Sequence, residues 1–311
     1  EIEQDSLVSN VVYELSDVSS RKENVVLVAE ENGEIVGLSS LERLDWDSRY
    51  FGFGMARIRY LIREGGYRKA FHLKCMLISS LLKECQEKGY RHVSARVHTE
   101  DISSIHAFEN EGFNLMDTVV TYCFDFRRGR IAEIKNQCHI REFKTDDVPI
   151  LVDIARESFW KERVSTSRFD ADPSLPEEKT HKMYERWIEN SRKGFAYHVI
   201  VAEIAGSPVG FTTCKLHNAL TKVLGIRFGD MVLSAVSPLA RKKGVYTSMI
   251  NAGLRWFSDK VDIVELGTQV SNYPVQKAWT KLGFRIVRSQ HTFHKFNTAL
   301  ADSSGSMKMA L

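Results

Sequence analysis

The chain has 311 residues and a mass of 35.6 kDa, a length that favours two domains, and its 43% hydrophobic and 27% charged residues are ordinary for a globular protein. A formal net charge of +3 gives no electrostatic sign of nucleic-acid or membrane-surface binding. No apolar run is long enough for a membrane helix, and the chain does not open with a signal-peptide pattern. We therefore expect a cytoplasmic protein that binds neither nucleic acid nor membranes, and its oligomeric state stays open.

The cysteines and histidines give no sign of a metal centre. The five cysteines form no C-x-x-C pair and have no regular spacing, which argues against a disulfide framework or a zinc ribbon. His291 and His294 are spaced H-x-x-H, but the sequence around them is typical of a strand, where residues three apart face opposite sides. No metal site is expected.

The first half of the chain predicts a short series of strands and helices. Residues 28–37 indicate a strand, a Gly-containing turn and a second strand. Apolar residues then keep helical spacing from Leu73 to Cys85. A strand at 92–97 leads into a shorter helix ending at Gly112, the residue type favoured at a left-handed helix cap.

The second half repeats this order. Residues 201–210 match 28–37 without a gap, and residues 261–284 match 90–113, with Asn272 over Asp101 and Trp279 over Phe108. An amphipathic helix from Tyr246 to Phe257 lies between the two matches. The sequence therefore predicts tandem α/β (mixed α+β) domains, each a mixed, mostly antiparallel sheet flanked by helices. The expected boundaries are 1–128 for a degenerate first domain, 129–138 for a linker, 139–297 for a catalytic domain and 298–311 for a flexible tail.

A basic glycine turn stands out in the second half. The strand at 231–236 continues through Arg241-Lys242-Lys243-Gly244 into the next helix, so backbone N–H groups and the helix dipole can hold a diphosphate there. The alternative is a solvated turn whose glycine relieves backbone strain. A fixed offset of 171 places Leu73 over Gly244 (244 − 73), and we expect no such turn in the first half.

These residues resemble a known family. Residues 241–246 are similar to the pyrophosphate loop of the GNAT superfamily of acyl-CoA-dependent N-acetyltransferases, and Asn272, Trp279 and Gly283-Phe284 resemble a later motif of that family. The resemblance covers about 139 to 297 well and about 7 to 126 weakly. It implies tandem acyl-CoA N-acyltransferase-like domains that use acetyl-CoA as acyl donor, without a metal. The cofactor contacts that it implies are Val236, Arg241, Lys242, Lys243, Gly244, Val245, Tyr246, Thr247, Asn272 and Trp279.

Two positions depart from the family pattern. Tyr246 stands at the family's final Gly or Ala position, so its side chain must turn away from the phosphate. Trp279 stands where the family usually has a Tyr that protonates the departing thiolate, and an indole N–H cannot take over that role.

A second, weaker resemblance indicates the class of the acyl acceptor. Residues 44–52 and 167–173 look like the two-domain bacterial branch typified by TDP-fucosamine acetyltransferase, which implies a nucleotide-linked amino-deoxy sugar as partner. A peptide, antibiotic or polyamine amine remains an alternative, as does a non-catalytic acyl-CoA-binding protein. The candidate acceptor contacts are Trp46, Arg168, Tyr184 and Gln269, although aromatic residues more often pack in a core or an interface.

The implied mechanism is direct attack of the amine on the thioester in a ternary complex. Backbone N–H groups near Val236 would polarise the carbonyl as an oxyanion site, and no protein nucleophile is required. A group that accepts the amine proton is needed. The candidates for it are Asp230, Glu265 and His291, and Tyr246 and Tyr273 are candidate proton donors.

Overall fold

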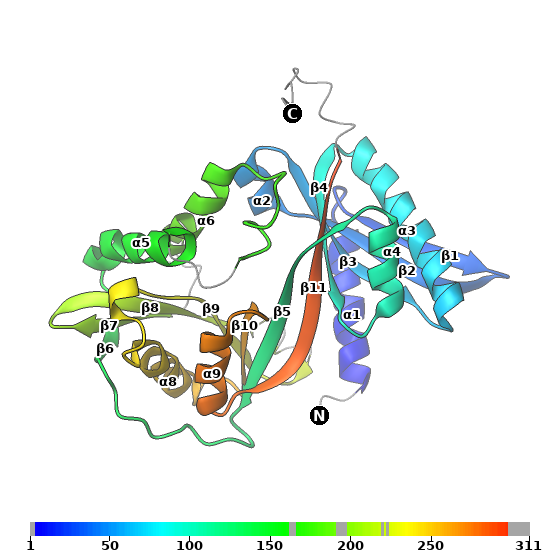
Figure 1. Cartoon of the computed structure of the whole chain (residues 1–311). Coiled ribbons are helices and arrows are strands. Elements are labelled where there is room, and N and C mark those ends of the chain that lie inside the picture. Colours follow the sequence, from blue (N-terminus) through cyan, green and yellow to red (C-terminus); the bar gives the residue numbers. More distant parts are fainter. Residues whose placement is uncertain (1–3, 162–165, 191–197, 219–220, 222–223, 298–311) are drawn as a thin grey trace. The chain divides into compact units, whose positions relative to one another are not determined.

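The computed structural model describes residues 4–161, 166–190, 198–218, 221 and 224–297, and the chain divides into two compact units (Figure 1). Unit 1 comprises Glu1–Asn10, Val119–Asp170 and Glu177–Ser289, and unit 2 comprises Val11–Thr118, Ala171–Pro176 and Gln290–Leu311. The expected tail, 298–311, lies outside the described residues. Each unit has a mixed, mostly antiparallel sheet flanked by helices, so the predicted fold class is confirmed.

Unit 2 begins with the predicted hairpin. β1 (Val25–Glu31) and β2 (Glu34–Arg43) are joined at Asn32 and Gly33, whose φ angles of 54° and 82° are the left-handed values of a tight hairpin turn. β3 (Gly54–Arg63) and β4 (Tyr90–His98) follow, and the strand order is β1-β2-β3-β4-β11 with only β3 and β4 parallel. The helices are α1 (Gln4–Ser19), which begins in unit 1, α2 (Asp45–Phe51), α3 (Tyr67–Glu87) and α4 (Ile102–Asn110).

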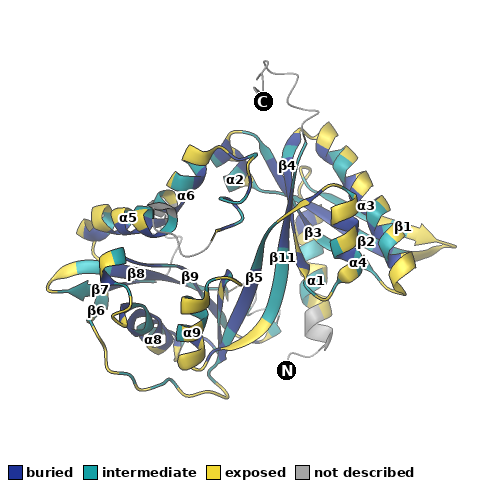
Figure 2. Ribbon diagram, in the orientation of Figure 1, coloured by how far each residue is buried: buried dark blue, intermediate teal, exposed yellow. Residues whose placement is uncertain are grey.

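The apolar side of α3 and α4 covers the sheet of unit 2 because their buried residues recur at helical spacing. Figure 2 shows the resulting contrast between buried strands and the exposed outer sides of these helices. The core includes Leu41, Ile58, Ile78, Leu81, Val93, Ala95, Phe108, Phe113 and Phe293.

The last strand of each half of the sequence joins the sheet of the other half. Val119–Asp125 of β5 (Asn114–Asp125) pairs with β10 in unit 1, whereas Gln290–Phe296 of β11 (Arg285–Phe296) pairs with β4 in unit 2. The compact units are therefore discontinuous in sequence, and the expected domain ranges, 1–128 and 139–297, remain a prediction.

Unit 1 has the strand order β5-β10-β9-β8-β7-β6. Its strands are β6 (His139–Glu142), β7 (His198–Ile204), β8 (Ser207–Leu216), β9 (Phe228–Val236) and β10 (Ile263–Gln269). Its helices are α5 (Val148–Arg156), α6 (Glu177–Asn190), α8 (Val245–Phe257) and α9 (Tyr273–Lys281), with short helical turns η1 (Thr145–Asp147), η2 (Glu157–Lys161) and η4 (Pro238–Ala240).

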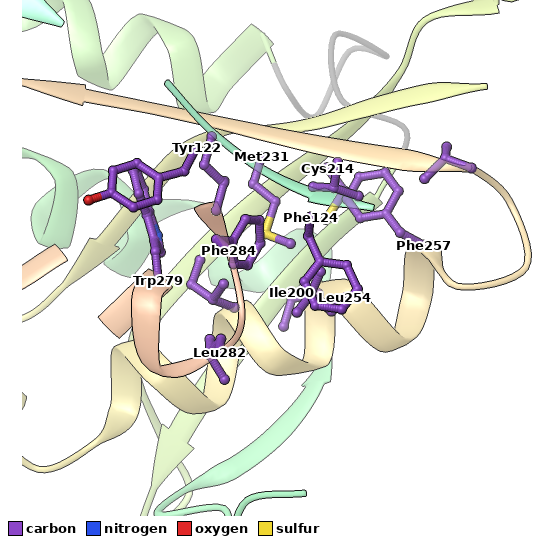
Figure 3. Close-up of a cluster of buried hydrophobic side chains, with 14 of the residues drawn as sticks. Tyr122, Phe124, Ile200, Cys214, Met231, Leu254, Phe257, Trp279, Leu282 and Phe284 are labelled. Carbon is purple, nitrogen blue, oxygen red and sulfur yellow. The ribbon is translucent and has the colours of Figure 1, made fainter. Parts of the chain in front are cut away.

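The core of unit 1 lies between α8, α9 and the strands β5, β9 and β10. Figure 3 shows Tyr122 and Trp279 at one end of this cluster and Phe257 at the other. All five cysteines are free thiols, and burial raises the pKa of Cys85 to about 12. Among the described helices, none is long and apolar enough to cross a membrane.

Candidate functional site

Two neighbouring strands of unit 1 separate in the middle of the sheet. β9 and β10 pair in parallel at Phe228–Ile263, Gly229–Val264 and Asp230–Glu265 only. Both strands are described to their ends, and β9 continues to Val236 and β10 to Gln269 without pairing further with each other. Beyond Asp230, the main-chain groups on the β10 side of β9 therefore face a gap, while those on the other side pair with β8.

The backbone N–H of Val236 points toward that gap. The N–H of Ser237 donates to the Val209 carbonyl at the start of β8, at 2.8 Å. Successive N–H groups of a strand point in opposite directions, so the N–H of Val236 faces the side of β10. The Val236 carbonyl faces the same side and accepts from the Ser158 hydroxyl at 3.0 Å. A backbone donor is thus aimed at the place where β9 and β10 separate.

The turn that follows β9 has several features that suit an anion. Lys242 and Gly244 both have left-handed φ angles, of 62° and 77°, and Gly244 is the N-cap of α8. Among the described residues, no side chain caps this helix, and its first turn contains no acid, so its first N–H groups can bind a ligand. Lys242 and Lys243 are exposed, while Arg241 reaches back to the Val236 carbonyl at 3.4 Å. Main-chain donors and positive charge meet at one turn.

Glycine is favoured at residue 244 for two reasons. Its φ angle is left-handed, and a Cβ there would lie 2.7 Å from Cγ of Gln137. The Gln137 N–H also donates to the Ser248 hydroxyl in α8 at 3.2 Å. The expected linker therefore runs beside this turn, an arrangement that nothing in the sequence indicated.

Tyr246 turns its side chain away from the turn and toward the core. Its hydroxyl accepts a hydrogen bond from Trp279 Nε1 at 3.0 Å and also hydrogen-bonds Ser234 on β9. Burial raises the pKa of Tyr246, so the resting hydroxyl is protonated near neutral pH. Trp279 is only 2% exposed and packs against Tyr122 (Figure 3). The indole N–H at the family's tyrosine position is thus linked to a phenol from the neighbouring helix.

Asp230 and Glu265 lie side by side where the strands part. Asp230 Oδ2 is 3.0 Å from Nε2 of His217, the residue that follows β8, and both side chains are about one-third exposed, at 32% and 30%. Glu265 instead forms an ion pair with Arg288 at 3.2 Å. Sequence reasoning missed His217, because nothing in the sequence shows that the end of β8 lies beside residue 230 of β9.

Asn272 differs from its counterpart in unit 2. Asp101 caps α4 by accepting from the Ser104 N–H at 3.0 Å, and it also accepts from Lys74 at 2.9 Å. Asn272 stands at the N-cap of α9 but makes no side-chain cap there, and its amide donates to Thr268. Its buried Oδ1 has no hydrogen-bond partner among the described residues. This oxygen can accept a hydrogen bond from a bound molecule.

The four expected acceptor contacts are divided between the two units, three in unit 1 and Trp46 in unit 2. In unit 1, the Arg168 guanidinium lies 4.4 Å from the Phe169 ring centre, and Tyr184 is buried against Phe159. Gln269 ends β10 and is half-buried.

Trp46 and His291 belong to unit 2. Trp46 stacks on Tyr50 at a ring distance of 5.0 Å, and Nδ1 of His291 hydrogen-bonds Thr118 at 2.9 Å.

The fixed-offset equivalence of Leu73 with Gly244 is wrong. Leu73 lies inside α3, and a Cβ at Gly37 would be 2.8 Å from its Cδ2. In unit 1, a Cβ at Gly210 would be 3.1 Å from Sδ of Met249 in α8. Because Gly210 matches Gly37 in the repeat, Leu73 corresponds to Met249. The offset fails because three residues (64–66) join β3 to α3, whereas eight (237–244) join β9 to α8.

Comparisons with known proteins agree with this geometry. Residues 161–284 match the acetyltransferase (GNAT) family. A GCN5-related N-acetyltransferase from Sphaerobacter thermophilus has a similar structure, with a TM-score of 0.60, 14% identity, and coverage of 92% of this chain and 84% of the other. A tandem GNAT protein of the clavulanic acid biosynthesis pathway gives a TM-score of 0.53 at 14% identity, over 88% and 84% of the two chains.

A third similar structure is a glucosamine N-acetyltransferase region in a fungal multi-domain GH3 β-N-acetylglucosaminidase. Its TM-score is 0.58 at 14% identity, over 94% of this chain and 35% of the other. No curated protein matches the chain. The family match places an acetyltransferase domain of the GNAT type at residues 161–284, and the similar structures share the fold of the chain. The chain is an acyltransferase.

Proposed function

We propose that unit 1 transfers an acetyl group from acetyl-CoA to the amine of a nucleotide-linked amino-deoxy sugar. The observation that carries the proposal is the separation of β9 from β10 directly beside the glycine N-cap of α8. The turn can hold a diphosphate, and the gap can receive an extended chain running from that diphosphate toward Asp230.

The residues present fit acetyl-CoA. The first N–H groups of α8 and the exposed Lys242 and Lys243 would hold its diphosphate, and Gly244 leaves the main chain open to it. The unpartnered Oδ1 of Asn272 would accept a hydrogen bond from the same molecule. Trp279 is buried, and we assign it a supporting role through Tyr246 rather than direct contact.

Four groups account for the chemistry. The acceptor nitrogen bonds to the thioester carbon while the carbon–sulfur bond breaks, and the N–H of Val236 stabilises the developing oxyanion. His217, oriented by Asp230, takes the proton of the amine. The Tyr246 hydroxyl gives its proton to the departing thiolate and regains one through Ser234.

Between the two acids at the separation of the strands, the contacts favour Asp230. Glu265 is engaged by the guanidinium of Arg288 at 3.2 Å, which occupies this carboxylate with an ion pair. Asp230 is paired with an imidazole, the side chain best suited to accept a proton near neutral pH.

The acceptor class rests on resemblance and on charge. The glucosamine N-acetyltransferase region with a similar structure acts, by its description, on an amino sugar. A hollow at α5 and α6 is lined by three glutamates, of which Glu185 is paired with Arg156 and Glu178 with Lys182. A surface whose acids are mostly paired with basic residues does not favour a polycationic acceptor such as a polyamine.

The test is a thiol-release assay with acetyl-CoA and four amine classes: a nucleotide-linked amino sugar, free glucosamine, a polyamine and a peptide. We expect the nucleotide-linked sugar to give the highest kcat/KM. A higher value for the polyamine or the peptide would refute the acceptor assignment. Tight binding of acetyl-CoA without thiol release on any amine would refute transferase activity.

A further inference from the structure

A cluster of metal-ligating side chains lies in unit 2, outside the proposed acyl-transfer site. His92 on β4, His294 on β11 and Asp172, from the segment between η2 and α6, bring one ligand atom each to a common point. Asp172 Oδ2 is 2.9 Å from His92 Nε2 and 2.7 Å from His294 Nδ1, and the two nitrogens are 3.2 Å apart. All three residues are buried, at 1%, 2% and 6% exposure for His92, His294 and Asp172.

The strands explain why the histidines meet. β4 and β11 are antiparallel, with His294 opposite Ser94 and Phe296 opposite His92, so the two histidines are diagonal neighbours on one face. Val93 and Phe293 point to the other face, into the apolar core under α3 and α4. His291, three residues from His294, faces the opposite side from it, as the strand pattern predicted.

The carboxylate is fixed in place by its own segment. Oδ1 of Asp172 accepts from the Ser174 N–H at 2.9 Å and from the Ser174 hydroxyl at 2.5 Å, which leaves Oδ2 for the histidines. Outer hydrogen bonds of this kind orient the ligands of metal sites. Thr292, two residues before His294 on the same face, has a buried hydroxyl with no partner among the described residues.

Charge also favours a cation. The ion pairs of Asp172 are with the two histidines, and the described residues offer it no Lys or Arg. A carboxylate buried without a Lys or Arg partner is costly in a protein interior, and a bound cation would compensate its charge. In a tetrahedral zinc site, ligand atoms about 2.0–2.1 Å from the ion lie roughly 3.3 Å apart, so the cluster needs to open by only a few tenths of an ångström.

We propose that His92, Asp172 and His294 bind one Zn²⁺ ion in unit 2, with the fourth position open to water or to the Thr292 hydroxyl. Two imidazole nitrogens and a carboxylate oxygen form a donor set suited to zinc. The ion would fasten Ala171–Pro176, which comes from the second half of the sequence, to strands β4 and β11. The site has a structural role and takes no part in acyl transfer.

Calorimetric titration with Zn²⁺ alone, on the full chain after chelator treatment, tests the proposal. We expect one ion per chain, a loss of affinity of more than about 100-fold in Asp172→Asn, and a loss of about 10–100-fold in Ser174→Ala, which removes an outer hydrogen bond. His291→Gln is the matched control on the same strand and should bind like the unaltered chain. Absence of stoichiometric binding, or equal affinity in Asp172→Asn, would overturn the proposal.

A second measurement does not depend on variants that fold. Co²⁺ added to the unaltered chain should give the visible absorption of a tetrahedral nitrogen and oxygen site, without a thiolate charge-transfer band. A thiolate band would assign the ion to the free cysteines and overturn the proposal. In Asp172→Asn the tetrahedral spectrum should disappear, and its persistence would likewise contradict the assignment.

Discussion

The hydroxyl of Tyr246 links the two residues of the proposed coenzyme site that depart from the family pattern, Tyr246 itself and Trp279. Tyr246 and Trp279 are 33 positions apart, and each is unusual for its place in the family motif. The structure joins them by a 3.0 Å hydrogen bond. Sequence reasoning could identify both positions but not their contact, because that contact depends on how α8 and α9 pack.

Replacement of Tyr246 by Phe should remove the proton donor and keep the aromatic packing. We expect kcat in the thiol-release assay to fall by about 100-fold, the low end for general acid–base catalysis, with little change in acetyl-CoA affinity. Tyr273→Phe is the control, because Tyr273 is 73% exposed on the neighbouring helix. Full activity in Tyr246→Phe would show that the thiolate is protonated by another group or by solvent.

The short helices α4 and α9 show how two elements of similar sequence diverge. The offset between the halves correctly matched Asp101 with Asn272, and both are N-caps. The carboxylate of Asp101 accepts hydrogen bonds from Ser103, Ser104 and Lys74. By contrast, Oδ1 of Asn272 has no hydrogen-bond partner among the described residues. The sequence gives the position of each cap, but the partner of Asp101 depends on Lys74 being buried under α4.

Asp101→Ala should destabilise the chain by about 3 kcal/mol, because it removes a helix cap and leaves the buried Lys74 ammonium without its carboxylate. Chemical denaturation at neutral pH measures this loss. Asp146→Ala, at an exposed acid in η1, is the control. A loss below about 0.5 kcal/mol would contradict the structural role of this pair.

The carboxyl group of Asp101 also makes the stability of the fold depend on pH. Burial alone would raise the pKa of Asp101, but the hydrogen bonds from Ser104, Lys74 and Ser103 outweigh it and hold the pKa below its usual value. Its contribution to stability is therefore complete above the unfolded pKa of about 3.9 and is lost as pH falls through the lower folded pKa. The stability difference between the unaltered chain and Asp101→Ala should shrink below about pH 4 in acid titrations, and a constant difference would contradict this.

The duplicated architecture of the whole chain could be predicted from its two repeated landmarks, because strand, turn and helix patterns are local properties. Two long-range features could not. The last strand of each half pairs outside its own half, and no periodicity encodes the partner of a strand. The shorter connection before α3 shifts the helix register, which is why the fixed offset selected Leu73.

The central claim is that the turn before α8 binds acetyl-CoA through its main chain. Calorimetric titration of acetyl-CoA into Gly244→Ala and Gly206→Ala tests it directly. Both glycines have left-handed φ angles, 77° and 78°, but a Cβ at Gly206 meets nothing within 4 Å, so that variant controls for backbone strain alone. We predict that Gly244→Ala weakens binding by at least about tenfold, or roughly 1.4 kcal/mol, while Gly206→Ala binds like the unaltered chain. Equal affinity in all three proteins would contradict the account.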